Sequence, residues 1–304
     1  QRHLTIPCEM CIRDSFMAHA RVAPVQVVAW GHPDTTGIST LDYFLSARPL
    51  ETPESLADYS ETVIRLSRLP CYYEPFAAPT QVPVRAAYGL PETATLYCCP
   101  QTLQKLHPHF DRVLAGILEQ DQNGVLVFIE GQPKEWIQHI RQRWQQVSSH
   151  LAERVIVLPQ QPLDRFMGLL AHSDVLLDPI YFGSGNTLYE SMVYGTPIVT
   201  WPGRFARGRI VAAAYTQMGI PEVEAPVAHR AEDYVRIAVE LGRQPERRAA
   251  LRRRLQLAAA QGLYADQGVV QELETFFVAA LAAAARGEKL PADWVSAVQT
   301  GDRQ

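Results

Sequence analysis

The most regular pattern of hydrophobic and polar positions runs from residue 95 to residue 201. Short β-branched or apolar runs alternate there with longer segments of helical period, at the spacing of βα units. We expect strands at 95–99, 125–130, 155–158, 174–177 and 198–201. We expect helices at 108–120, 133–150, 162–171 and 184–194. The alternation predicts an α/β fold with a doubly wound parallel sheet, which binds ligands outside the carboxyl ends of its strands.

The pattern is less regular on either side of this core. The β-branched run 25–30 predicts a buried strand, and 40–45 a second, shorter one. Segment 51–69 contains acidic residues and a pattern of helical period, which indicates a helix. Five prolines between residues 70 and 91 indicate an extended interdomain linker. Beyond residue 230 the pattern predicts helices alone, at 231–242, 245–260 and 268–285.

The composition is that of an ordinary globular protein, with 47% hydrophobic and 20% charged residues. A net charge of −4 argues against a nucleic-acid partner. The chain has no run of about eighteen apolar residues, so we expect no membrane partner. The chain has five cysteines, an odd number and too few for disulfides to stabilise a fold of this size. Sparse cysteines of this kind predict a cytoplasmic location. The arginines of 247–254 predict a solvated helix face.

The first residues are predicted not to belong to the fold. Cys8 and Cys11 form a C-x-x-C motif, but no second pair or histidines follow at zinc-site spacing, so we expect neither a metal nor a redox role. The segment PCEMCIRDS, residues 7–15, resembles translated sequencing-adapter sequence, and the chain does not begin with Met. We therefore expect residues 1–15 to be an artefact of a truncated reading frame or a disordered tail.

The stretch 174–203 carries the most specific chemical signal. It predicts a buried strand, a glycine-containing loop, a helix and another strand. The free N–H groups and the positive end of the helix dipole would bind an anion. A carboxylate on the same helix face could accept hydrogen bonds from two sugar hydroxyls. Diphosphate and ribose together predict a nucleotide site formed by Gly183, Ser184, Gly185, Asn186, Thr187 and Glu190.

Two further loops follow predicted strands. Lys105 lies between the strand 95–99 and the helix that begins at Pro108, where it could reach a phosphate or be an ordinary surface lysine. Gln101 and Thr102 nearby offer an amide and a hydroxyl to a base or phosphate. His32 follows the strand 25–30 in the sequence GHPDTTG, and either contacts a donor or acceptor substrate or caps the strand end.

Three segments, in order along the chain, carry a family resemblance. They are VQVVAWGHPDTTGISTLDYFLS, LYCCPQTLQKLHPHFD and DVLLDPIYFGSGNTLYESMVYGTPIVTWPGRFARGR. Residues 16–285 resemble the O-linked N-acetylglucosamine transferase family, glycosyltransferase family 41, which includes Spindly-type and bacterial tetratricopeptide-linked members. The resemblance implies a GT-B fold of two facing doubly wound domains. It also implies inverting, metal-independent transfer of a sugar, most simply from UDP-N-acetylglucosamine, to Ser or Thr of a protein or peptide, without a cofactor.

The resemblance also assigns roles to individual residues. Lys105 matches the family lysine on the donor diphosphate, and residues 185–187 match the phosphate-binding helix start. Glu190 matches the acidic residue on the ribose, and Thr102 falls near the base and phosphates. His32 falls where animal members have Tyr and related bacterial N-glycosyltransferases have His. We therefore expect Lys105 and His32 to be catalytic.

The resemblance leaves several alternatives open. We expect residues 16–80 to be a remnant of an N-terminal catalytic domain with a linker, 81–262 a Rossmann-like nucleotide-sugar domain, and 263–304 a C-terminal helix and tail. No convincing general base is found, so we expect the isolated chain to bind nucleotide weakly and to turn over poorly. The alternatives are GDP-fucose as donor, transfer of glucose from UDP-glucose to Asn, a nucleotide-sugar 2-epimerase, and an inactive nucleotide-binding fragment.

Overall fold

The computed structural model describes residues 16–296, except 33, 79–81, 132 and 134. These residues form two compact units, which we describe separately. Unit 1 holds the chain up to Tyr73, the short segment Arg204–Arg207, and the chain from Ala265 on. Unit 2 holds Glu74–Gly203 and Gly208–Tyr264. This division differs from the predicted boundaries near residues 80 and 262. The predicted tail 1–15 lies outside the described residues.

Unit 2 is built on a five-stranded parallel sheet in the order β6-β5-β4-β7-β8. Its strands are β4 (Thr95–Cys99), β5 (Gly124–Ile129), β6 (Val155–Leu158), β7 (Val175–Leu177) and β8 (Ile198–Val199). The chain builds the sheet outward from β4 to β6, and then returns to the other side of β4 to add β7 and β8. The predicted parallel α/β sheet is confirmed, and the strand order reverses between β4 and β7.

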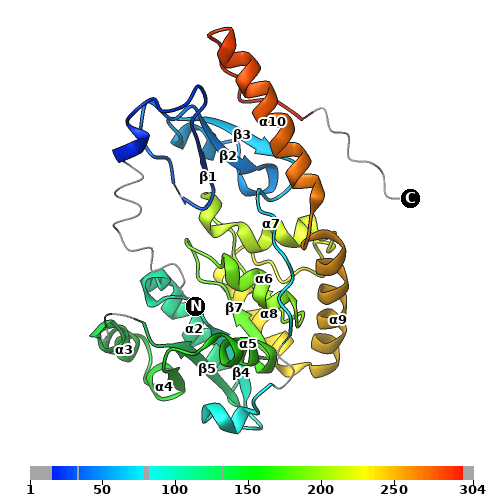
Figure 1. Cartoon of the computed structure of the whole chain (residues 1–304). Helices are drawn as coiled ribbons and strands as arrows, with labels where there is room; N and C mark the ends of the chain where they lie inside the picture. The colour runs from blue at the N-terminus through cyan, green and yellow to red at the C-terminus, as the bar shows by residue number, and fades with distance from the viewer. Residues whose placement is uncertain (1–15, 33, 79–81, 132, 134, 297–304) are drawn as a thin grey trace. The chain divides into compact units, whose positions relative to one another are not determined.

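Helices connect these strands, as the sequence pattern predicts, and further helices follow the last strand (Figure 1). They are α2 (Pro108–Gln120), α3 (Glu135–Val147), α4 (Ser149–Glu153), α5 (Leu163–His172), α6 (Asn186–Met192), α7 (Ile210–Gln217), α8 (Ala231–Arg243) and α9 (Pro245–Gly262). Helices α2 and α8 pack side by side, and Phe110 of α2 meets Tyr234 of α8 edge-on with ring centroids 5.7 Å apart. Both rings are fully buried in the core beneath the sheet.

Unit 1 contains a three-stranded parallel sheet of β1 (Val27–Ala29), β2 (Tyr43–Ala47) and β3 (Thr62–Leu66). Helix α10 (Gln267–Ala285) packs on it through Phe276, whose ring meets that of Tyr43 edge-on at 5.4 Å. The helical reading of 51–69 is wrong over β3. Val63, Ile64 and Leu66 of this strand are buried, and Thr62 and Arg65 are half-buried. The acidic residues that suggested a helix precede the strand, and one of them, Asp58, ends a short 3₁₀ helix, η2 (Ser55–Asp58).

Two other expectations also need correction. The proline-rich segment 70–91 is not an extended linker throughout, because a 3₁₀ helix, η3 (Arg85–Tyr88), fixes its second half to unit 2. Arg85 pairs with Asp174 at 2.9 Å. The arginines of α9 are not all solvated: Arg248 pairs with Asp174 at 2.8 Å, and Arg252 donates to the Ala171 carbonyl at 3.0 Å. Burial lowers the pKa of Arg252 to about 10.

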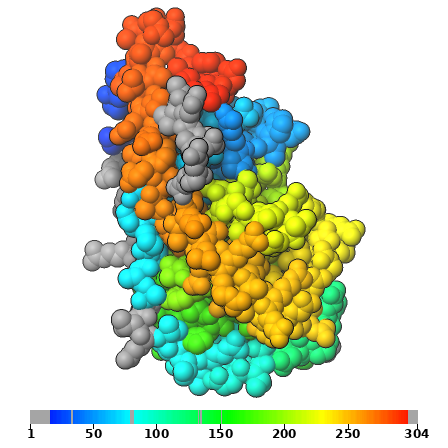
Figure 2. All heavy atoms as spheres, turned by 90° about the vertical axis from the view of Figure 1, so that its right-hand side faces the viewer, coloured from blue at the N-terminus to red at the C-terminus, as the bar shows by residue number. Residues whose placement is uncertain are grey.

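One stretch, Pro245–Ala285, is long and apolar enough by length and composition to cross a membrane. Its best window has a mean hydropathy of 1.4 and is 28% buried. The structure divides this stretch into α9 and α10, both visible at the surface in Figure 2. Helix α10 buries Phe276 in the core of unit 1 and exposes Val278. A single stretch of this kind is weak evidence for a membrane span, and the absence of a membrane partner stays a prediction.

Candidate functional site

The loops that follow β4 and β7 leave the sheet at the same edge, where the strand order reverses. In a doubly wound sheet these two loops diverge to opposite faces and leave a crevice at the carboxyl ends of the strands. The loop after β4 leads into a short 3₁₀ helix, η4 (Leu103–Lys105), and the loop after β7 leads into α6. The Lys105 ammonium joins the two loops by donating to the Gly183 carbonyl at 2.8 Å.

Neutral groups hold the Lys105 ammonium. Its Nζ donates to Gln101 Oε1 at 2.9 Å and to the Gly183 carbonyl, and it lies 4.6 Å from the centroid of the Phe182 ring. Burial lowers the pKa of Lys105, whereas the charge of Asp178 raises it. No carboxylate of the described residues pairs directly with this ammonium. Its positive charge therefore remains available to an anion.

Gln101 brings a second donor to the same place. Its side chain is buried, and its Oε1 accepts from Lys105, which leaves the Nε2 for another partner. Among the described residues, this Nε2 has no hydrogen-bond partner. A buried donor without a partner costs about 1–3 kcal/mol, which a ligand oxygen would recover. Thr102 is exposed at the rim, where its carbonyl accepts the Lys105 N–H at 3.0 Å.

The α6 start presents backbone N–H groups without a side-chain cap. Gly185 is the N-cap residue and makes no side-chain cap, and a Cβ atom added to it would meet nothing within 4 Å. The first N–H groups of a helix lack partners within the helix. The N–H of Ser184 is not free for a ligand, because it donates to Asp178 Oδ1 at 2.6 Å. Asn186 is exposed and Thr187 half-buried, so both face solvent at the mouth of the loop.

Glu190 lies one turn into α6 and is 4% exposed. Burial raises the pKa of its carboxyl to about 7. Among the described residues no hydrogen bond reaches this carboxylate. It follows Asn186 by one helical turn, as the predicted common face requires. A pair of hydroxyl donors, such as those of a ribose, would satisfy it.

His32 belongs to unit 1, whereas the other predicted site residues belong to unit 2. Its Nδ1 lies 3.0 Å from the Asp34 carbonyl, and its side chain is exposed. Its loop is organised by the buried Glu61, which accepts from Thr35 Oγ1 at 2.7 Å and from the Thr36 N–H at 2.9 Å. No carboxylate of the described residues orients the His32 ring. Its catalytic role stays a prediction.

Sequence reasoning missed two residues of this site. Asp178 directly follows β7, is fully buried, and accepts from both Ser184 and Thr200. Phe182 covers the Lys105 ammonium. A signal for Asp178 was present, because a carboxylate that ends an apolar strand is costly unless it is paired. No signal pointed to Phe182. Over the described residues, no three His, Cys, Asp or Glu side chains gather as metal ligands.

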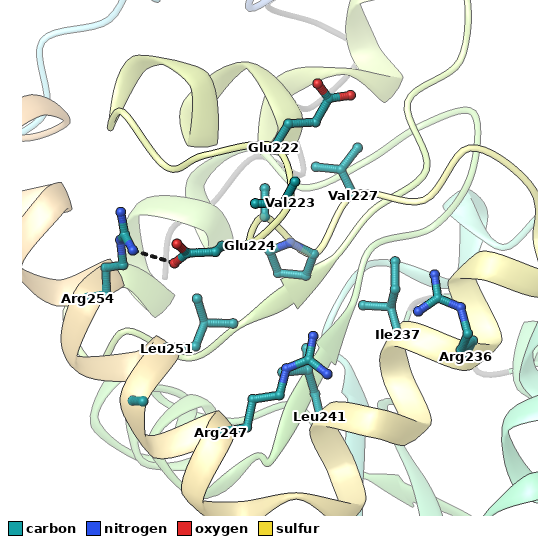
Figure 3. Close-up of a pocket in the computed structure, with 13 residues that line it drawn as sticks. Glu222, Val223, Glu224, Val227, Arg236, Ile237, Leu241, Arg247, Leu251 and Arg254 are labelled. Carbon is teal, nitrogen blue, oxygen red and sulfur yellow. Dashed lines mark hydrogen bonds and ion pairs between the residues drawn. The ribbon is translucent and has the colours of Figure 1, made fainter.

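A second cationic feature lies elsewhere in unit 2. A groove of about 510 Å³ opens between α8, α9 and the loop 222–227, and arginines project over its apolar floor (Figure 3). Arg254 pairs with Glu224. Arg247 and Arg236 share Glu240, at 2.9 and 3.2 Å. Because each arginine already has a carboxylate partner, the groove offers little uncompensated charge to an anion.

The sequence of the chain is similar to those of known proteins. The family model described as Glycosyl transferase family 41 matches residues 74–272. The UDP-glucose:protein N-beta-glucosyltransferase of Actinobacillus pleuropneumoniae serotype 7 (strain AP76) is 28% identical over 242 residues, which cover 78% of this chain and 37% of that protein. A SPINDLY protein of Solanum lycopersicum, described as a probable UDP-N-acetylglucosamine–peptide N-acetylglucosaminyltransferase, is 28% identical over 225 residues, or 73% of this chain and 23% of that protein.

A solved structure shows the same fold. A mutant of the O-GlcNAc transferase of Thermobaculum terrenum superposes with a TM-score of 0.73 and 26% identity, over 88% of this chain and 50% of that one. The α/β architecture with parallel sheets is that of the GT-B glycosyltransferases. The chain spans between about a quarter and half of the length of these relatives.

Proposed function

The chain belongs to glycosyl transferase family 41, and on that premise we propose that unit 2 binds the diphosphate of a nucleotide sugar between Lys105 and the start of α6. The proposed reaction is inverting and independent of metal. It transfers the sugar to a protein or peptide acceptor. The proposal rests above all on one observation: Lys105 is held by two neutral oxygens and an aromatic ring, beside the unpartnered Gln101 Nε2.

In the proposed reaction the leaving group is a nucleoside diphosphate, which gains negative charge as the bond to the sugar breaks. Lys105, the Gln101 amide and the first N–H groups of α6 would stabilise this charge. Fixed donors aimed at a developing charge contribute about 2.7–4 kcal/mol each at comparable oxyanion sites. Glu190 would accept the ribose hydroxyls, and Thr102 would lie near the base and phosphates.

We propose UDP-N-acetylglucosamine as the donor and Ser or Thr as the acceptor. A second assignment, glucose from UDP-glucose to Asn, is favoured by the matched relative from A. pleuropneumoniae. A panel of UDP-N-acetylglucosamine, UDP-glucose and GDP-fucose, each offered with Ser-, Thr- and Asn-containing peptides, separates these assignments. We expect transfer by this chain alone to be slow, because its described residues include no convincing general base.

Calorimetric titration with UDP tests the proposed site. The unchanged chain should bind UDP, and Lys105→Ala should weaken binding by about 100-fold or more if the ammonium supplies the expected stabilisation. The exposed Lys289, paired with Asp42 at 3.1 Å in unit 1, provides a matched control. Lys289→Ala should leave UDP affinity unchanged. Equal UDP affinity of the unchanged chain and Lys105→Ala would contradict the proposal.

A further inference from the structure

The side chain of Asp178 is buried behind the proposed diphosphate site. It lies at the carboxyl end of β7 and is 1% exposed. Oδ1 accepts from the Ser184 N–H at 2.6 Å, and Oδ2 accepts from the Thr200 hydroxyl at 2.7 Å. The backbone of Asp178 is fixed as well, because its carbonyl accepts from the Tyr234 hydroxyl at 3.0 Å. The carboxylate therefore has a defined position.

That position determines the shape of the loop ahead of α6. A Cβ atom on Gly183 would lie 2.7 Å from Asp178 Oδ2, closer than van der Waals contact allows. Glycine at this position is what lets the carboxylate approach the backbone and engage Ser184. With Ser184 held, the adjacent Gly183 carbonyl accepts from Lys105 at 2.8 Å. Two hydrogen bonds, joined by the Gly183–Ser184 backbone, thus connect the carboxylate to the ammonium.

We propose that Asp178 is a positioning residue for the diphosphate site: its carboxylate fixes the Gly183–Ser184 turn and supports the charge on Lys105 without pairing with it. The inference rests on the proposed function. It differs from an ordinary salt bridge, in which the carboxylate would occupy the place of the incoming phosphate. Because Asp178 does not contact Lys105 directly, its charge favours the protonated ammonium while the ammonium stays free to bind the phosphate.

The electrostatics agree with this arrangement. Burial lowers the pKa of Lys105, and the charge of Asp178 opposes that effect, as the charge of Cys99 would if its thiol were ionised. Burial raises the pKa of the Cys99 thiol, which keeps it neutral. Burial also raises the pKa of Asp178, against hydrogen bonds from Thr200 and Ser184 and the charge of Lys105. Asp178 is thus the carboxylate that counters the desolvation of Lys105.

The matched control is Asp121, which is 4% exposed. It also accepts one hydroxyl, from Tyr97 at 2.8 Å, and one backbone N–H, from Asn123 at 3.1 Å. Asp178→Asn and Asp121→Asn therefore remove equivalent buried carboxylates. Thr200→Val removes one hydrogen bond to Asp178 but no charge.

The experiment measures UDP affinity by calorimetry from pH 7.5 to pH 10.5, with urea unfolding of each variant as the measure of stability. Asp178→Asn should weaken UDP binding by about 5- to 50-fold. It should also move the alkaline loss of binding, where Lys105 deprotonates, to lower pH by about one unit. Asp121→Asn should bind UDP as the unchanged chain does, and Thr200→Val should weaken binding without moving the alkaline limb.

Each outcome decides between the two proposals. The contrary result for Asp178→Asn is that both the UDP affinity and the alkaline pH at which binding is lost stay unchanged. If Lys105→Ala loses binding at the same time, that result would overturn the positioning role alone. Failure of the unchanged chain to bind UDP would overturn the proposed function and this inference with it. If Asp178→Asn does not fold, Thr200→Val and Gly183→Ala decide instead: both should weaken UDP binding, and normal affinity in both would refute the role.

Discussion

Two cationic regions of unit 2 differ in how their positive charge is compensated. At the ends of β4 and β7, one ammonium is held by neutral oxygens and by a ring. In the groove of α8 and α9, three arginines each contact a carboxylate. The groove contains more cations and a well-defined volume, yet the single lysine has the stronger claim to an anion. The lack of a directly paired carboxylate, rather than the number of basic residues, distinguishes the two regions.

The difference follows from position in the fold. Lys105 lies in a loop at the point where the strand order reverses, and burial there removes water from its ammonium. The arginines lie on helix surfaces, where Arg236, Arg247 and Arg254 keep half of their side chains or nearly so in solvent. Exposed pairs of this kind contribute about 0–1 kcal/mol, because water screens them. We therefore interpret these arginines as ordinary surface ion pairs of α8 and α9 and not as an anion site.

Removal of Lys105 should have the largest effect. Lys105→Ala should reduce donor turnover, measured as sugar transfer or donor hydrolysis, by about 10²- to 10³-fold. The thermal unfolding midpoint should change little, since the ammonium costs energy to bury. Retention of near-normal turnover would remove Lys105 from the leaving-group role.

Gln101→Glu gives Lys105 a carboxylate partner, as the arginines of the groove already have. A carboxylate at residue 101 would pair with Lys105 and repel the diphosphate, so UDP affinity should fall by about 10- to 100-fold. Gln101→Met removes the amide without adding charge, and should cost less than about 10-fold. Calorimetry on both variants compares them directly. Equal losses would show that compensation of the ammonium does not matter.

Glu190→Gln should change the pH dependence of the free energy of unfolding. Burial raises the pKa of Glu190 in the folded chain to about 7, above its ordinary value of 4.5. The unfolded chain therefore releases this proton first, and stability falls as the pH rises from 4.5 to 7. Glu190→Gln should be about 1–3 kcal/mol more stable than the unchanged chain at pH 8, and equal to it near pH 4.5. Urea unfolding at both pH values measures this.

The same variant should bind UDP several-fold more weakly, because an amide accepts fewer hydroxyl hydrogen bonds than a carboxylate. Glu190→Asp keeps the charge but shortens the reach, and provides the control. A Glu190→Gln chain that gained no stability at pH 8 would show that this carboxylate is well solvated in the folded state.

The groove should respond least. Arg254→Ala removes the partner of Glu224, and should change UDP affinity by less than about twofold and unfolding free energy by at most about 1 kcal/mol. Calorimetry and urea unfolding measure the two effects. A marked loss of UDP binding in Arg254→Ala would transfer the anion site to the groove and reverse the comparison.

The sequence predicts unit 2 better than unit 1 for a physical reason. In 95–201 each strand is a buried apolar run with a helix after it, so local pattern and fold agree. In unit 1, β3 follows turns rich in acidic residues, and α10 joins the sheet from the far end of the chain. A pairing so distant in sequence leaves no local signal. The same limit explains Arg252, whose carbonyl partners precede it by 79 residues or more.

The candidate site shows the same contrast. Lys105, the 183–187 loop and Glu190 follow from residue type and from their place after a strand. The partners of Lys105 do not, because Gln101 and Gly183 reach it through loop conformation. Asp178 was within reach of sequence reasoning, as a carboxylate closing an apolar strand, but its contact with Ser184 depends on a glycine backbone next to it.

A crystal structure of the chain with UDP would test the central claim most directly. The account predicts diphosphate oxygens within hydrogen-bond distance of Lys105 Nζ and Gln101 Nε2, with the ribose hydroxyls on Glu190. A diphosphate bound among the arginines of the α8–α9 groove, with the space before Lys105 empty, would contradict it.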